Sequence, residues 1–556
     1  MKFKTSFLFI PLLLLSSCGS GEGDTSFTPT PSSQEPSSQG GERREIVVEE
    51  REVQYIDDFY RNYYQIFPYA YADSNGDKVG DLKGICDKFN YIKSLNITGL
   101  WLTPVHPSQD YHKYSVKDYK AIDSQFGSLN DYDNLVTLCH NNHMTIILDL
   151  VFNHSSNQHP WFTSCMEAHI NNQTSNKYYN YYNVKAVDSK GQIPDGWREY
   201  RYVNNKYYIY EGRFDTSMPD LNLQSVLDGT NTNLINDLKD IMRFWLIDHH
   251  VDGFRLDACT SFFTGDNEKN YQFLNWLKAE AEIIKPNTYI IGEVLSGITV
   301  YGGFYQNTNI DSYFCFADTA NYSNRVYSPI LQENATKIAT YISSDIKSAG
   351  DAVPAPLLAN HDIGRSYKKD PNKNKLVHAL LALDNGATFE YYGDEAAMAN
   401  VFTNIEDQGY RMPMYWGDNY TCNPITSEGT MEQKYPQGSV ATLNSDPDSI
   451  LNYYRKVYKT RLQNPELARG SLEALDDEHP CIYQNDDKSC AIIKRAYNGS
   501  NLYIVANLSA TNEQAIDLSS LGLSNLKIVA DLSVGDTPYY LGSNLVMTPQ
   551  SILLIH

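Results

Sequence analysis

Acidic side chains stand at the ends of three separate apolar runs of the sequence. Asp257 follows VDGFRL, Glu293 follows YIIG, and Asp362 follows an apolar run that ends in NH. Cleavage of a glycosidic bond needs carboxyl groups in three roles. One carboxylate serves as nucleophile, one carboxylic acid protonates the leaving oxygen, and a further anion stabilises an oxocarbenium-like transition state.

A cation accompanies the first of these acids. Arg255 and Asp257 are two residues apart, so on a strand their side chains point the same way. The positive charge would keep Asp257 ionised, which suits a nucleophile. Glu293 follows an apolar run, and an apolar setting would raise its pKa and keep it protonated as the acid.

Eight short apolar runs, most of them preceded by amphipathic helical stretches such as residues 129–142 and 233–250, would carry these side chains. Eight parallel strands with crossover helices predict an α/β fold, a (β/α)8 TIM barrel with its active site at the carboxyl ends of the strands. Asp149, Asn153, His154 and His361 also stand at predicted strand ends. The eight runs are NYYQIFPYAY, ITGLWLTPV, TIILDLVFNH, VDGFRLDA, YIIGEV, DSYFCFA, APLLANHD and ATFEYYGDE.

Two further domains are predicted around this barrel, which occupies residues 53–152 and 233–465. Residues 153–232 follow the third strand and are too long for a βα loop, so we expect an inserted domain B there. Residues 466–556 contain short alternating strands separated by turn residues, which predict a C-terminal all-β domain, a β-sandwich.

The amino terminus has the features of an export signal. Residues 1–17 combine two lysines, a short apolar stretch and Leu-Ser-Ser before Cys18, a pattern that resembles the bacterial lipobox and implies lipid attachment at Cys18. Residues 18–52 are rich in Ser, Pro, Gly and Glu and predict a disordered tether. The sequence therefore predicts an extracytoplasmic lipoprotein anchored to a bacterial membrane or cell surface. An ordinary signal peptide with an incidental cysteine is the alternative.

Composition narrows the classes of partner. The net charge of −22 argues against a nucleic-acid-binding surface, which would need a basic patch. Tyrosine is abundant, with 43 residues against 21 phenylalanines, and its flat face and hydroxyl suit a polyhydroxylated ligand. An AT-rich genome would raise the same count. No cysteines have zinc spacing. Cys481 and Cys490 flank a predicted hairpin and could form a disulfide bond.

In the order and placing of these motifs, the chain resembles the α-amylase family of retaining glycoside hydrolases. DLVFNHSS, GFRLDA, GEV and NHD stand in the family's order, and the resemblance extends from about Tyr63 to the C-terminus. It implies Asp257 as nucleophile, Glu293 as acid/base and Asp362 as stabiliser of the transition state. Asp149 is expected to contact Arg255, and Arg365 to support the third carboxylate. The substrate contacts that the resemblance implies are Tyr114, which would stack under the sugar, His154, Arg255, His361 and Arg365.

The stretch DSNGDKVGD supplies oxygen atoms at alternate positions. Asp73, Asn75, Asp77 and Asp81 offer side-chain oxygens and Val79 its carbonyl, which is the chemistry that Ca²⁺ prefers. No Glu occupies the twelfth position, so the stretch is not an EF-hand. The resembling family places a calcium loop at this point of the chain. An Asp/Gly turn without metal is the alternative.

Three features bear on specificity. MPDLN (residues 218–222) resembles a group between oligo-1,6-glucosidases and neopullulanases, and Ala258 resembles enzymes that act on α-1,4 bonds. Ser115 departs from the aspartate that exo-acting α-glucosidases place there. Together they favour an endo-acting α-amylase that cleaves α-1,4-glucosidic bonds of starch-like glucans or maltooligosaccharides by double displacement. We expect the protein to be a monomer. The alternatives are an exo-acting α-glucosidase, another oligosaccharide hydrolase or transglycosylase, a non-catalytic amylase-like protein, and a starch-binding surface protein.

Overall fold

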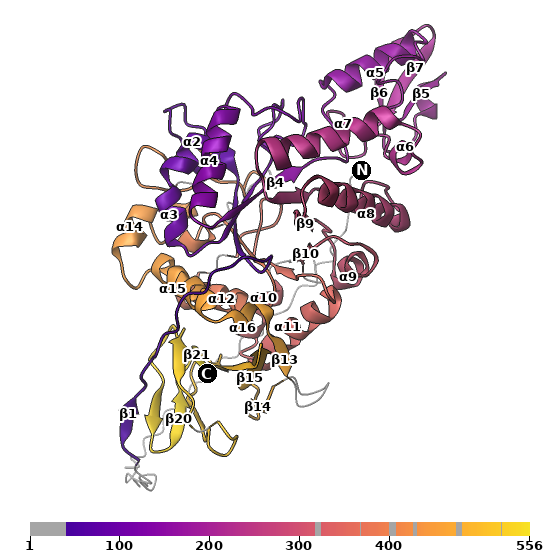
Figure 1. Ribbon diagram of the computed structural model, residues 1–556. Coiled ribbons are helices and arrows are strands. Elements are labelled where there is room, and N and C mark those ends of the chain that lie inside the picture. Colours follow the sequence, from indigo (N-terminus) through magenta and orange to yellow (C-terminus); the bar gives the residue numbers. More distant parts are fainter. Residues whose placement is uncertain are drawn as a thin grey trace, which may run out of the picture. The chain divides into compact units, whose positions relative to one another are not determined.

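The computed structural model describes residues 41–316, 324–366, 369–399, 407–425, 431–473, 481–523 and 525–556 (Figure 1). Residues 42–556 form one compact unit. Cys18, the predicted signal peptide and the predicted tether up to residue 40 lie outside the described residues. Within the described ranges, no helix combines the length and the hydropathy that a membrane span requires.

The eight apolar runs form one parallel sheet, which confirms the predicted (β/α)8 barrel. Adjacent strands follow the order β11-β10-β9-β8-β4-β3-β2-β12. A parallel bridge between Leu357 and Phe389 joins the two ends of this order. The strands are β2 (Asn62–Ile66), β3 (Gly99–Leu102), β4 (Thr145–Leu150), β8 (Gly253–Leu256), β9 (Tyr289–Gly292), β10 (Ser312–Cys315), β11 (Ala355–Pro356) and β12 (Thr388–Tyr391).

Aromatic side chains fill the interior of the barrel. The ring of Tyr63 stacks between Tyr289 and Phe389, with centroids 5.5 and 4.6 Å away and planes within 9° of parallel. Backbones also approach closely, because a Cβ atom at Gly253 would lie 1.8 Å from the carbonyl oxygen of Tyr289. Glycine at the start of β8 therefore lets this strand sit against β9, and these two strands lead to Asp257 and Glu293.

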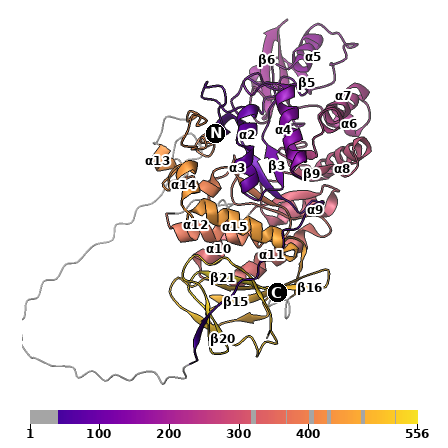
Figure 2. The ribbon, with the colours of Figure 1, turned by 60° about the vertical axis from the view of Figure 1, so that its left-hand side comes forward.

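Helices surround the barrel (Figures 1 and 2). The predicted helix 129–142 is α4, and a capping box of Ser128 and Asp131 fixes its start. The predicted helix 233–250 is shorter than expected, because the α-helix ends at Arg243 and the chain continues as a wider π-turn over Phe244–Asp248. The main helices are α4 (Leu129–Asn141), α7 (Thr232–Arg243), α8 (Asn267–Ile284), α9 (Ile298–Asn307), α10 (Asn324–Leu331), α11 (Thr336–Ala349), α12 (Pro371–Ala382) and α15 (Ile450–Gln463).

The chain between β4 and α7 contains a small antiparallel sheet, as expected for an insertion. The sheet has the order β5-β7-β6 and follows helix α5 (Pro160–Ile170). Antiparallel bridges from His154 to Asp220 and from Tyr182 to Leu221 hold the end of the insertion beside the chain that follows β4. The strands are β5 (Val184–Val187), β6 (Trp197–Val203) and β7 (Lys206–Glu211).

The carboxyl-terminal part of the chain is antiparallel β-structure in two sheets. One has the order β13-β15-β16-β21-β18 with β14 beside β15, and the other has the order β1-β19-β20-β17. Cys481 and Cys490 are both buried and free, so the disulfide that the sequence allowed is not formed. The strands are β13 (Ser471–Glu473), β14 (Tyr483–Gln484), β15 (Cys490–Tyr497), β16 (Ser500–Asn507), β17 (Gln514–Ile516), β18 (Ile528–Asp531), β19 (Tyr539–Leu541), β20 (Asn544–Met547) and β21 (Ser551–Ile555).

The end of the predicted tether differs from expectation. β1 (Arg43–Glu45) pairs with β19, and Val48 forms a bridge with Ile528. Arg51 then forms an ion pair of 2.9 Å with the buried Glu466. Regular structure therefore begins near residue 43 rather than 53, because a strand near the far end of the chain satisfies the backbone groups of this segment. Local composition does not reveal such a partner.

Candidate active site

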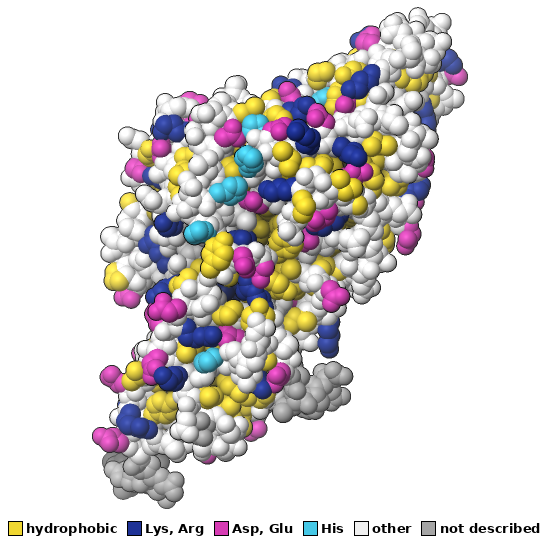
Figure 3. Space-filling model, in the orientation of Figure 1, with side chains coloured by type: hydrophobic (Ala, Val, Ile, Leu, Met, Phe, Trp, Pro, Cys, Tyr) yellow, Lys and Arg dark blue, Asp and Glu magenta, His cyan; other side chains and the backbone are white. Residues whose placement is uncertain are grey.

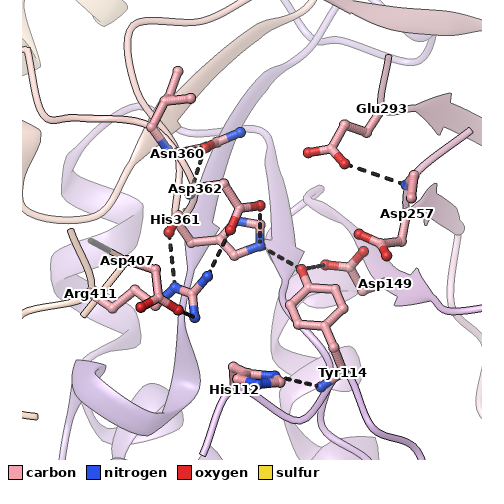
Figure 4. A network of polar contacts seen from close by, with 12 residues as sticks. His112, Tyr114, Asp149, Asp257, Glu293, Asn360, His361, Asp362, Asp407 and Arg411 are labelled. Atoms are coloured by element: carbon pink, nitrogen blue, oxygen red, sulfur yellow. Dashed lines mark hydrogen bonds and ion pairs between the residues drawn. The ribbon is translucent and has the colours of Figure 1, made fainter. Parts of the chain in front are cut away.

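The three predicted carboxylates are at the carboxyl ends of barrel strands, and Figure 4 shows them turned toward one another. Asp257 follows β8, Glu293 follows β9, and Asp362 comes six residues after the end of β11. The chain stays paired beyond the strands, since Glu293 N donates to Leu256 O at 2.9 Å. Ala258 then turns with φ = 49°, in the left-handed region. This pairing and turn hold the nucleophile and acid candidates side by side.

A single buried guanidinium joins most of the acids. Arg255 Nη1 donates to Asp149 Oδ1 at 2.6 Å and to Asp257 Oδ1 at 2.7 Å. Its Nη2 lies 2.7 Å from Glu293 Oε1, as an ion pair without the angle of a hydrogen bond. The Arg255 side chain is fully buried. One positive charge therefore faces three carboxyl groups, which favours a proton on at least one of them.

The acids of the site differ in their affinity for a proton. Burial raises the pKa of Glu293 to about 8, and the charges of Asp257, Asp362 and Asp149 act in the same direction against Arg255. Burial would also raise the pKa of Asp362, but His361, Arg411 and Arg255 outweigh it and hold this pKa below its usual value. At neutral pH, Glu293 is thus suited to give a proton and Asp362 to remain an anion.

The ring of Tyr114 lies at the floor of this cluster. It stacks on His361 with planes 3° apart and centroids 5.5 Å apart. Its hydroxyl donates to Asp149 Oδ2 at 3.1 Å, accepts from Arg255 Nη1 at 3.2 Å and lies 2.6 Å from His361 Nε2. Trp101 Nε1 donates to the same Asp149 oxygen at 3.2 Å. Tyr114 is therefore held in one orientation before any ligand arrives.

A cavity of about 180 Å³ opens onto these groups. His154 is one of its walls, and burial lowers the pKa of this histidine to about 4, so its ring is neutral near pH 7. Most of the other lining side chains are polar, and Phe214 and Met218 contribute apolar surface from the inserted domain. The lining residues are His112, Tyr114, His154, Phe214, Met218, Asp257, Asp362, Asp407 and Arg411.

The role of Arg365 as a substrate contact and support of the third carboxylate stays a prediction. Its contacts are with Asp394 Oδ1 at 3.0 Å, Tyr410 O at 3.1 Å and the face of Tyr391, 3.7 Å from the ring centre. The guanidinium on the third carboxylate is instead that of Arg411, whose Nη2 donates to Asp362 Oδ1 at 2.7 Å. Arg365 is not among the residues that line the cavity.

Sequence reasoning missed Arg411, Asp407 and Gln65. Arg411 Nη1 forms an ion pair with Asp407 Oδ2 at 2.7 Å, and both residues lie in a long segment without a periodic pattern. Gln65 Nε2 lies 2.8 Å from His361 Nδ1. A signal existed only for Gln65, since a glutamine in the middle of a fully buried barrel strand is an unusual residue to bury.

The predicted calcium loop is compact and tied to the rest of the molecule. Asp73 Oδ1 accepts from Asn75 N at 3.1 Å and from Gly76 N at 2.6 Å, and Asp77 Oδ1 accepts from Val79 N at 2.8 Å. Asp81 Oδ1 caps α2 (Leu82–Asp87) by accepting from Gly84 N at 2.6 Å. The donor types suit a hard cation, but the described residues contain no converging group of three acidic, His or Cys side chains. Calcium at this loop therefore stays a proposal.

If Ca²⁺ binds here, a chelator should lower the melting temperature, because a ligand of the native state stabilises it by about 2.7 kcal/mol at 100 times its Kd. Asp77→Ala should lower the melting temperature without chelator and abolish the chelator's effect. Asp517→Ala, in an exposed turn of the C-terminal domain, is the matched control. The measurement is differential scanning fluorimetry, and a wild-type protein insensitive to chelator contradicts the proposal.

Comparisons with known proteins agree with this geometry. Residues 65–470 match the family described as "Alpha amylase, catalytic domain". Alpha-amylase 3 of Dictyoglomus thermophilum is 30% identical over 466 residues, which cover 82% of this chain and 86% of that protein. The oligo-1,6-glucosidase of Heyndrickxia coagulans is 25% identical over 527 residues, which cover 80% of this chain and 91% of that protein.

Solved structures match over most of the chain. The structure described as Eubacterium rectale Amy13B superposes with a TM-score of 0.79 at 30% identity, covering 91% of this chain and 97% of the other. The alpha-amylase from H. orenii superposes with a TM-score of 0.71 at 26% identity, covering 90% of this chain and 99% of the other.

Proposed function

The chain belongs to the alpha-amylase family, and from that premise we propose that it is a retaining glycoside hydrolase that cleaves α-1,4-glucosidic bonds in starch-like glucans or maltooligosaccharides. One observation carries the proposal: Arg255 lies 2.7 Å from both Asp257 and Glu293, beside a cavity that Asp362 also lines. The closeness of a nucleophile candidate and an acid candidate, with a third anion on the same cavity as Asp257, supports the proposal.

The proposed reaction is a double displacement. The Asp257 carboxylate attacks the anomeric carbon while Glu293 gives its proton to the departing glycosidic oxygen. The resulting glycosyl-enzyme ester is cleaved by a water molecule that Glu293, now a carboxylate, deprotonates. Asp362 supports the positive charge that develops at the sugar ring in both steps. Arg255 stays paired with Asp257 and Glu293 and balances the change of charge between them.

The carbohydrate partner is supported by the rest of the site. Tyr114 offers a ring face, and neutral His154 offers a hydrogen bond without a charge, two features that suit hydroxyl-rich sugars. On the face drawn in Figure 3, Lys and Arg side chains are interspersed with Asp and Glu, which favours a sugar over a nucleic acid. The protein is proposed to act as a monomer.

We propose endo action, because the position at which exo-acting relatives carry an aspartate is Ser115. The Ser115 hydroxyl donates to Asp110 and lies 3.3 Å from Ser217 Oγ, and this serine is fully buried. It brings no carboxylate to the end of the cavity. An exo-acting α-glucosidase is the second candidate, since an oligo-1,6-glucosidase is among the relatives of similar length.

The product profile distinguishes these two candidates. From soluble starch, we expect a mixture of oligosaccharides early in the reaction, with a rapid loss of iodine staining. Pullulan and maltotriose, assayed in parallel by chromatography, report on α-1,6 linkages and on chain length. Glucose as the sole early product would make the enzyme exo-acting. Activity no higher than that of an Asp257→Asn preparation would favour a non-catalytic starch-binding protein.

We further propose that the chain is exported and anchored through lipid on Cys18, which gives an extracytoplasmic, membrane-bound enzyme facing polymeric substrate. The support is the lipobox-like Leu-Ser-Ser-Cys at residues 15–18. Mass spectrometry of the amino-terminal peptide tests this, and an unmodified peptide would contradict it.

A further inference from the structure

Gln65 is a buried amide directly behind the candidate active site. It lies on β2 with 1% of its surface exposed, and its Nε2 is 2.8 Å from Nδ1 of His361. Its other amide atom, Oε1, has no hydrogen-bond partner among the described residues. Because the Nε2 atom of a glutamine amide can only donate, this contact requires an acceptor at Nδ1 of His361.

The opposite side of the His361 ring faces the site. Nε2 lies 2.6 Å from the hydroxyl oxygen of Tyr114 and 3.0 Å from Asp362 Oδ2. Burial lowers the pKa of His361 to about 3 despite the opposing charge of Asp362, and Arg411, Arg255 and His112 add to the lowering. The ring is therefore neutral at working pH and carries one N–H only.

Donor and acceptor counting assigns that proton. The ionised Asp362 can only accept, and the Tyr114 hydroxyl gives its own proton to Asp149 Oδ2. Both oxygens of Asp149 accept, one from Arg255 and the other from Trp101 and Tyr114. Nε2 of His361 thus faces two oxygen atoms that have no proton to give it, which favours a proton on Nε2. Nδ1 must then be the acceptor, and the described residues place one donor beside it, the Nε2 amide of Gln65.

We propose that Gln65 is a positioning residue that fixes the neutral His361 in the tautomer with its proton on Nε2. The N–H then faces Tyr114 and Asp362, which both line the cavity. In the other tautomer, an Nε2 lone pair would face the Asp362 carboxylate at hydrogen-bond distance and repel it. Gln65 thereby acts on Asp362 indirectly, through the His361 ring, and has no contact with the substrate of its own.

The effect on turnover rests on the proposed function, but the tautomer does not. In the hydrolase, Asp362 must keep its place while positive charge develops at the sugar. A ring whose protonated Nε2 lies 3.0 Å from Asp362 Oδ2 attracts this carboxylate, whereas a lone pair at the same place repels it. Exchanging Gln65 should therefore lower kcat more than it raises KM, by about 10–100-fold in kcat/KM, by analogy with the loss seen when the hydrogen-bond partner of a metal-binding histidine is removed.

Nitrogen-15 NMR of histidine-labelled protein tests the proposal without any substrate. The chain has 13 histidines, and His361→Asn identifies the His361 signal by its loss. In the wild type, we expect a protonated Nε2 and an unprotonated Nδ1. In Gln65→Glu, the carboxylate cannot donate to Nδ1, so we expect a proton on Nδ1. Gln65→Met removes the donor without adding charge, so the share of His361 with its proton on Nδ1 should rise above that of the wild type, although Tyr114 and Asp362 still favour Nε2. This variant keeps the test available if Gln65→Glu does not fold.

Asn62→Asp is the matched control. It makes the same amide-to-carboxylate change on the same strand, where Asn62 Oδ1 accepts from the buried Arg461 at 3.0 Å. Its His361 spectrum should equal that of the wild type. A wild-type His361 with its proton on Nδ1, or an unchanged tautomer in both Gln65 variants, overturns the proposal. An inactive wild type with the expected spectrum would reject the proposed function and leave the tautomer assignment standing.

Discussion

Replacing Asp257 by asparagine should lower kcat/KM on starch by about 10⁴–10⁶-fold, the range seen when a catalytic nucleophile or its activating partner is removed. The amide keeps the shape of the side chain but cannot form the glycosyl ester. Affinity for a maltooligosaccharide, measured by calorimetry, should stay close to that of the wild type because Tyr114 and the other cavity walls remain. Asp266→Asn is the matched control, since Asp266 caps α8 and asparagine caps equally well.

Chemical rescue by an added anion can distinguish the role of Asp257 as nucleophile from that of Asp362 as the third carboxylate. Azide should restore activity to Asp257→Gly better than to Asp362→Ala, because only the first vacancy faces the anomeric carbon from the attacking side. Proton NMR of the first products should show α-anomers from an α-glucan, the retaining outcome. An initial β-anomer would mean inversion and would remove Asp257 from the nucleophile's role.

Glu293→Gln should have the second largest effect, and its size should depend on the substrate. Starch and maltotriose, whose leaving oxygen needs a proton, should lose about 10²–10⁴-fold in kcat/KM, the usual contribution of general acid catalysis. Activated aryl glycosides, which depart without a proton, should lose far less in the glycosylation step. Equal losses on both classes of substrate would contradict the assignment. Glu268→Gln, at an exposed position of α8, is the control.

The pH profile tests the same residue independently. Because the pKa of Glu293 is raised to about 8, the acid form is present below this pH and is lost above it. Wild-type kcat/KM on starch should therefore fall as the pH rises through about 8. Glu293→Gln has no proton to lose, so its residual activity should lack this alkaline fall. A wild-type activity unchanged to pH 10 would show that Glu293 is not the essential acid.

The parts of the fold that were predictable are those with a local signal. The barrel strands are short apolar runs bounded by polar residues, and Asp257, Glu293 and Asp362 stand at their ends, so pattern and motif identified them together. Arg411 acts on Asp362 from a segment with no such pattern. Gln65 reaches His361 across 296 residues of sequence. Pairings of this kind form only when the barrel closes and brings distant segments together. No short stretch of the sequence contains both partners, so local patterns cannot predict them.

The same reasoning explains the error at the amino-terminal segment. Residues 43–52 read as part of a polar linker because their partners are in the last domain. Charged residues there do not remain in solvent, since Arg51 pairs with the buried Glu466. A rule that infers disorder from composition holds only where no distant strand or charge is available to the segment.

The pairing of β1 with β19 also affects when the amino-terminal segment can fold during synthesis. Arg44 donates to the carbonyl oxygen of Gly542, a contact that spans 498 residues. At about 5–20 residues per second, the ribosome needs roughly 25–100 s between the two partners. The first strand of the compact unit therefore has no β-sheet partner until β19 has been made. A chain that stops before β19 should therefore leave residues 43–45 open to a protease, even though Arg51 can already pair with Glu466.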